Sequence, residues 1–211
     1  MLFSALLAPR AFAQAQQPRR QPINPPQQAA LSANDQADIA RVEQYLNGIT
    51  SAQARFMQTN PNGTSSMGNF YIRRPGRLRF EYDPPSKLLI VADGFQVTMY
   101  DPATRDFGQW PIGWTAASFL VAPTIRLSGD IRVLRVDRAA GELRISMVQE
   151  KKPNEGRIEV VLGDAPLQLR RWTIWDARNV PVEVVLSSMR AGVFLPDHLF
   201  AQPIPKERDH P

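Results

Sequence analysis

The feature that most constrains this fold is a period-two alternation of apolar and polar residues, which runs through most of the chain. It is clearest in FYIRRPGRLRFEY (70–82), where Leu78, Phe80 and Tyr82 alternate with charged side chains. Such alternation is typical of strands that bury one face. Pro75-Gly76 interrupts the run and predicts a type II turn in which Gly76 has a positive φ. We therefore expect a β-hairpin with one apolar and one basic face.

The same patterning predicts about nine antiparallel strands in a meander, preceded by one helix. Apolar residues at spacings of three and four, from Ile39 to Ile49, indicate that helix, and Ser32 or Asn34 can cap it. Further strands are predicted at 54–58, 87–92, 95–100 (with Phe95, Val97 and Met99 on the apolar face), 131–137, 142–149, 157–163, 167–175 and 180–188. Residues 107–129 are expected to form a loop and a short apolar helix, TAASFLVA.

The expected fold class is mainly β with α, a curved antiparallel sheet or incomplete barrel. One helix and one short insertion give little cover for so many strands. The sheet either closes on a packed interior or encloses a cavity, and periodicity alone leaves both open.

The two ends of the chain differ from this folded region. The apolar run LFSALLA, followed by Ala11-Phe12-Ala13, indicates a signal peptide at 1–13, although the usual basic beginning is missing. Residues 14–31 are rich in Pro and Gln and are expected to form an extended linker. The folded domain is predicted at 32–205, with a tail at 206–211. The signal predicts export, and no later run approaches the roughly 18 apolar residues of a membrane span, so a soluble protein is expected.

Little in the sequence indicates an enzyme or a cofactor site. The only histidines are His198 and His210, near the C-terminus, and the common nucleophile and nucleotide-binding motifs do not occur. The chain has no cysteine, which excludes disulfides and thiolate metal sites. We predict no catalytic residues, no metal and no cofactor.

Nucleic-acid binding was weighed because the chain carries a net charge of +5 and mixes arginines with aromatic residues. A base-stacking surface needs both on one accessible face. In residues 77–82 the aromatic side chains and the arginines alternate. This phasing, together with predicted export, argues against nucleic acid.

The ordered series ARFMQ (54–58), GNFYIRRPGRLRFEYDPP (68–85) and LLIVADGFQVTMYDP (88–102) resembles the periplasmic outer-membrane lipoprotein carriers of the LolA family. The resemblance continues more weakly through 167–187 and Phe200. It implies an unclosed β-barrel covered by a helical lid, whose apolar cavity binds lipoprotein acyl chains. It also implies transport across the periplasm, from an inner-membrane ABC transporter to an outer-membrane receptor, by a monomer. That receptor is itself acylated through a cysteine, so the lack of cysteine favours the soluble carrier.

The resemblance also suggests functional residues. Arg74, which precedes the proline of the turn, corresponds to the family arginine that holds lid carbonyls in the empty form. Read from the sequence alone, Arg74 is more simply a solvated residue at a hairpin end, and the other three arginines of the stretch are expected to face water. The positions expected to line the acyl cavity are Phe56, Phe70, Ile72, Leu78, Phe80, Tyr82, Val97, Met99, Phe119 and Leu120.

Two other functions were considered beside the carrier. The first is a lipoprotein-sensing envelope-stress regulator of the same fold, which usually adds a second C-terminal domain. The second is a lipid-hydrolysing enzyme, against which the missing nucleophile motif argues.

Overall fold

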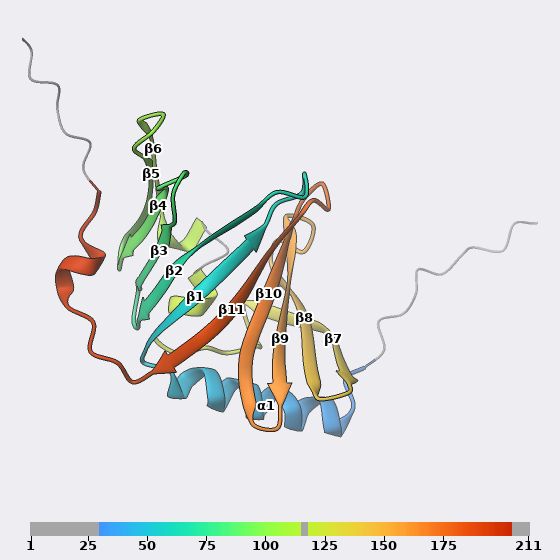
Figure 1. Ribbon diagram of the computed structural model, residues 1–211. Helices are drawn as coiled ribbons and strands as arrows, with labels where there is room; N and C mark the ends of the chain where they lie inside the picture. Colours follow the sequence, from blue (N-terminus) through green and yellow to red (C-terminus); the bar gives the residue numbers. More distant parts are fainter. Residues whose placement is uncertain (1–29, 115–117, 204–211) are drawn as a thin grey trace, which may run out of the picture.

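The structure is a computed structural model that describes residues 30–114 and 118–203 (Figure 1). The predicted signal peptide (1–13) and tail (206–211) lie outside these residues, as does nearly all of the predicted linker (14–31). None of the helices in the described part of the chain is long and apolar enough to cross a membrane.

Eleven antiparallel strands form one curved sheet, in the order β6-β5-β4-β3-β2-β1-β11-β10-β9-β8-β7. Neighbours in the sheet are consecutive in the chain except at the centre, where β1 pairs with β11. The edge strands β6 and β7 do not pair with each other, so the barrel is unclosed. The expected fold class is therefore confirmed. The strands are β1 (Ser51–Thr59), β2 (Ser65–Arg73), β3 (Arg77–Tyr82), β4 (Leu89–Asp93), β5 (Gln96–Asp101), β6 (Asp106–Pro111), β7 (Ile131–Ala139), β8 (Glu142–Gln149), β9 (Gly156–Asp164), β10 (Leu167–Asp176) and β11 (Pro181–Ala191).

The edge strand β6 was not predicted, because its sequence, DFGQWP, does not alternate clearly. It pairs with β5 along its whole length, yet nearly all of its side chains are exposed. Phe95 also departs from the prediction. It lies in the turn before β5 and is 85% exposed instead of joining the apolar face.

Helix α1 (Ala33–Gly48) begins where the sequence predicts and crosses the lower end of the sheet in Figure 1. Ser32 and Asp35 form a capping box, in which each side chain bonds to the other residue's backbone N–H. Val42 and Leu46 face the sheet and are buried. A short 3₁₀ turn, η1 (Ile112–Trp114), and a single-turn helix, α2 (Ser118–Val121), lie between the two edge strands. The first three residues of the predicted TAASFLVA helix lie outside the described residues.

The β2–β3 connection is a three-residue loop, because Arg73 pairs directly with Arg77 across the hairpin. Gly76 has the predicted positive φ, +79°. A side chain there is also excluded by space, since a Cβ atom would lie 2.6 Å from the Cα of Gly94 in the β4–β5 turn. The two turns therefore touch, and both lie at the end of the sheet where β2 and β4 finish.

The expectation that Arg73, Arg77 and Arg79 only face water is wrong. Arg73 and Arg77 both pair with Asp197, and Arg79 donates to the Leu199 carbonyl oxygen at 3.2 Å. These contacts hold the segment after β11, which includes the 3₁₀ turn η2 (Asp197–Phe200), against the outer face of the sheet. The sequence pattern correctly separated the arginines from the aromatic face. It could not show that a distant segment supplies their partners.

Candidate functional site

The concave inner face of the sheet is a continuous apolar interior. Seven of the ten residues predicted to line a cavity are buried in this core: Phe56, Phe70, Ile72, Leu78, Tyr82, Val97 and Leu120. Phe80 and Phe119 are partly buried and pack against it. Met99 is half-buried and lies outside this cluster. The structure therefore gathers nine of the ten around one interior.

Aromatic rings dominate the part of the interior below β1, β2 and β3. Phe56 makes edge-to-face contacts with Phe80 and Tyr82, with ring centroids 5.1 and 4.9 Å apart. Trp172, from β10, closes the cluster at 5.9 Å from the Phe70 ring and 6.4 Å from the Phe80 ring. Trp172 lies in the strand predicted at 167–175, but the pairing of β1 with β11, which brings β10 near these rings, has no local sequence signal.

The side chains of the interior form one buried cluster in this closed form. A void among them measures about 20 Å³, roughly the space of one water molecule. Predicted residues Phe70, Ile72 and Leu120 line the void, and so does the side chain of Arg74. The other lining residues are Leu46, Ile49, Ile125, Leu169, Leu186 and Met189, none of which the sequence singled out for the site.

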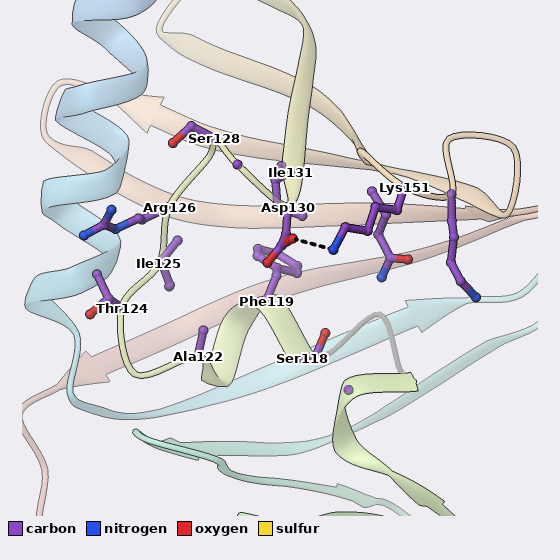
Figure 2. Close-up of a pocket in the computed structure, with 14 residues that line it drawn as sticks. Ser118, Phe119, Ala122, Thr124, Ile125, Arg126, Ser128, Asp130, Ile131 and Lys151 are labelled. Carbon is purple, nitrogen blue, oxygen red and sulfur yellow. Dashed lines mark ion pairs between the residues drawn. The ribbon is translucent and has the colours of Figure 1, made fainter.

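A larger groove opens beside α2 at the gap between the sheet edges (Figure 2). One part, of about 590 Å³, runs along the segment from Ala122 to Ile131. A second part, of about 270 Å³, reaches the inner face at Met147. The side chain of Met147 is fully buried. Both parts are lined by Phe119, which Figure 2 shows beside Ile131. Phe119 therefore lies between surface space and the apolar interior.

Arg74 joins the β2–β3 turn to the C-terminal end of α1. Its guanidinium donates to the carbonyl oxygens of Leu46 (2.7 Å), Asn47 (2.9 Å) and Ile49 (2.8 Å). Leu46 and Asn47 belong to the last turn of the helix, which carries the negative end of the helix dipole, and Ile49 is its C-cap. The Leu46 carbonyl also accepts a bond from the N–H of Ile49 at 3.2 Å. Partial burial lowers the pKa of Arg74, while arginine still remains charged at physiological pH. The contact of Arg74 with the end of α1 is observed, and its role in holding a lid over the interior stays a prediction.

Two further contacts, which sequence reasoning missed, tie the helical cover together. The backbone N–H of Gly76 donates to the carbonyl of Val121, the last residue of α2, at 2.8 Å. The side chain of Asn47 makes a reciprocal pair with the backbone of Ile125, at 2.8 and 2.9 Å. The loop 74–76 thus contacts both helices, and α1 is bonded to the segment that follows α2.

Tyr82 is the most strongly perturbed titratable group of the interior. Burial raises the pKa of the Tyr82 phenol from 10.0 to about 12, because the charged phenolate would lose its hydration. The hydroxyl donates to Oε1 of Gln58 at 2.6 Å. Within the described residues, no cluster of His, Cys, Asp or Glu side chains could bind a metal ion.

Comparison with known proteins identifies the family. The sequence model described as "Outer membrane lipoprotein carrier protein LolA" matches residues 47–202, which include the whole sheet and α2 but only the last two residues of α1. The chain belongs to the LolA family. Because this family consists of carrier proteins, the match supports the expectation of a binding protein rather than an enzyme.

Individual relatives agree with this assignment at modest identity. An outer-membrane lipoprotein carrier protein of Chromobacterium violaceum is 28% identical over 190 residues, covering 86% of this chain and 91% of the relative. The carrier of Pseudomonas entomophila is 34% identical over 108 residues, about half of each protein (48% and 51%). A solved LolA superfamily protein of Nitrosomonas europaea aligns with 78% of this chain and 97% of its own, at 10% identity and a TM-score of 0.44. The family assignment rests on the sequence comparisons.

Replacing Arg74 with leucine tests whether it holds the LolA-type cover. We expect Arg74→Leu to lower the free energy of unfolding by about 1–3 kcal/mol, because the carbonyls of Asn47 and Ile49 lose the guanidinium and that of Leu46 keeps only the Ile49 N–H. Hydrogen exchange should accelerate in residues 45–49 and not in β9 or β10. Arg178→Leu is the matched control, since Arg178 is exposed and its described partner is Asp176, two residues away. Unchanged exchange at the end of α1 would show that Arg74 does not hold the helix.

The Tyr82 phenol gives a prediction for alkaline stability. The pKa of the phenol in the folded protein lies above its unfolded value of 10.0. The contribution of the buried phenol to the free energy of unfolding is therefore complete below pH 10 and is lost as pH rises toward about 12. The loss should be on the order of 2–3 kcal/mol. In urea unfolding between pH 8 and 12, the free energy of unfolding of Tyr82→Phe should fall less with pH than that of the unaltered protein. Parallel curves would contradict burial of this phenol.

Proposed function

We propose that this chain is a soluble periplasmic carrier that binds the acyl chains of lipoproteins in its apolar interior and shuttles them between membranes. The observation that carries the proposal is the continuous apolar inner face under a helical cover, fastened at the loop 74–76. The family match and the carrier names of its relatives support the same function. The cargo would be received from an inner-membrane ABC transporter and handed to an outer-membrane receptor.

The interior must open before it can take a ligand. A void of about 20 Å³ holds about one water molecule, so an acyl chain of a dozen or more methylenes does not fit the closed form. The helices have to move away from the sheet, or the inner side chains have to separate. Either movement strains or breaks the contacts of Arg74 and Gly76 with the helix ends.

The relative energies allow such opening without ATP hydrolysis by the carrier. Each buried methylene stabilises a complex by about 0.8 kcal/mol, so one long acyl chain contributes roughly 10 kcal/mol. Hydrogen bonds from a charged donor such as Arg74 contribute about 1.5–3 kcal/mol each, and the neutral Gly76 bond contributes about 0.5–1.5 kcal/mol. Breaking the four guanidinium bonds of Arg74 and the Gly76 bond therefore costs an amount on the order of what one acyl chain returns. The hydrogen bonds would thus keep the empty carrier closed, while the free energy of burying an acyl chain would be sufficient to open it.

The groove beside α2 supplies the proposed starting point for cargo. It is already open in the closed form, and its deeper part ends at the buried side chain of Met147. Phe119 stands between the two parts. Rotation of this ring, or a shift of α2, would extend the groove into the interior, where Phe80 and Tyr82 lie.

The proposal predicts saturable uptake of a fluorescent fatty acid into a site shielded from water. Emission should rise and shift to shorter wavelength, and an unlabelled acyl lipopeptide should compete. Arg74→Leu should retain this uptake, because the arginine is not needed to bury methylenes, but it should transfer a bound lipopeptide to an acceptor much less completely. Arg178→Leu should behave like the unaltered protein in both assays.

Two outcomes would count against these assignments. A folded protein that binds no acyl ligand would overturn the carrier function. Normal transfer by Arg74→Leu would remove Arg74 from the mechanism while leaving the carrier function intact.

A further inference from the structure

Two phenylalanine side chains are almost fully exposed, which is unusual for so large an apolar group. Phe95 is 85% exposed and Phe194 is 89% exposed. The other exposed large apolar residues (Met57, Met67, Phe107 and Trp110) range from 40% to 57% and lie on strands, partly covered by neighbours. Phe95 and Phe194 lie instead in turns, outside any strand.

Phe95 lies next to a residue that touches the loop 74–76, and Phe194 lies next to a residue bonded to Arg73, just before that loop. Phe95 follows Gly94, which approaches Gly76 so closely that a Cβ there would clash at 2.6 Å. Phe194 precedes Leu195, whose carbonyl oxygen accepts a hydrogen bond from Arg73 at 2.6 Å. The two rings therefore belong to one end of the molecule, where β2 and β11 finish near the C-terminal end of α1 (Figure 1).

The chemistry of this end fits a lipid surface better than a protein partner. A protein interface needs a contiguous patch with a buried centre, whereas these rings stand on two separate, convex turns. Single aromatic side chains of this kind insert at the boundary between headgroups and acyl chains. Charged residues at these strand ends and turns are Arg73, Arg74, Arg77, Arg190, Asp93 and Asp197, a net charge of +2 that favours anionic lipid. Arg73 and Arg77 share Asp197 as their ion-pair partner, so the two of them still leave one positive charge.

We propose that this end is a membrane-contacting surface, which inserts the rings of Phe95 and Phe194 into the headgroup region of an anionic bilayer. The contact would set the loop 74–76, and with it Arg74, at the bilayer surface. Phe95 is also bonded to the helical cover, because its carbonyl oxygen accepts from the N–H of Ile112 in η1 at 3.0 Å. A force on the inserted ring would therefore act directly on the chain that leads to α2. The surface is independent of what the interior binds.

Vesicle flotation tests the proposal with the whole protein. Vesicles of phosphatidylcholine with phosphatidylglycerol should bind the protein, and added salt or pure phosphatidylcholine should weaken binding. Phe95→Ser and Phe194→Ser should each lower the partition coefficient roughly tenfold, since each removes one buried ring. Phe107→Ser is the matched control, because Phe107 is exposed on β6 near the opposite end. Binding that is absent, or equal in all variants, would overturn the proposal.

Because the chain has no cysteine, insertion can also be followed at a single site. When anionic vesicles are added, the emission of an environment-sensitive dye on Phe95→Cys should shift to shorter wavelength. The emission of the same dye on Phe107→Cys should not. Fatty-acid uptake measured without vesicles should be unchanged in both serine variants, which separates this proposal from the carrier function. Serine variants that bind vesicles normally but fail only in transfer would indicate a protein partner and overturn the bilayer contact.

Discussion

The closed form depends on how one guanidinium satisfies carbonyl groups at the end of α1. The last turn of any helix leaves carbonyls without intrahelical donors, and burial against a sheet removes the water that would otherwise bond them. From a loop of the sheet, Arg74 reaches two carbonyls of this turn, those of Leu46 and Asn47, and that of the C-cap residue Ile49. Arginine suits this place because it offers several donors in a fixed plane and stays charged. The helix is thereby attached to the sheet at its end, over the interior that it covers.

The interior itself explains why this attachment needs to be weak. An empty apolar cavity large enough for an acyl chain would forfeit packing and be costly, so the inner side chains collapse until about 20 Å³ remains. When the proposed carrier opens, the inner side chains lose contacts with one another and gain contacts with the cargo. For the proposed carrier, a small free-energy difference between the closed and open states would let a few hydrogen bonds at the loop 74–76 decide which of the two is populated.

Much of this could be predicted from residue patterns. Alternation identified the inner face, the helix and most strands, because burial on one side leaves a period of two or 3.6 in the sequence. It failed for β6, whose side chains are mostly exposed, and for Phe95, where a turn replaces the expected strand position. Long-range contacts left no local signal. The pairing of β1 with β11, the place of Trp172, and the partners of Arg73 and Arg77 depend on residues more than 100 positions away.

The family resemblance contributed what patterning could not. Arg74 alone looks like a solvated residue at a hairpin end, and only the R-P motif singled it out among four arginines. The contacts of Asn47 and Gly76 were not predicted at either level, because the Asn47 side chain bonds to the backbone of Ile125, 78 positions away, and Gly76 acts through a backbone N–H that any sequence supplies. The most direct test of the central claim is to incubate spheroplasts with the purified protein and assay the supernatant for lipoproteins. The account predicts that lipoproteins leave the membrane in a soluble complex with the carrier, whereas a folded, acyl-binding protein that releases none would contradict it.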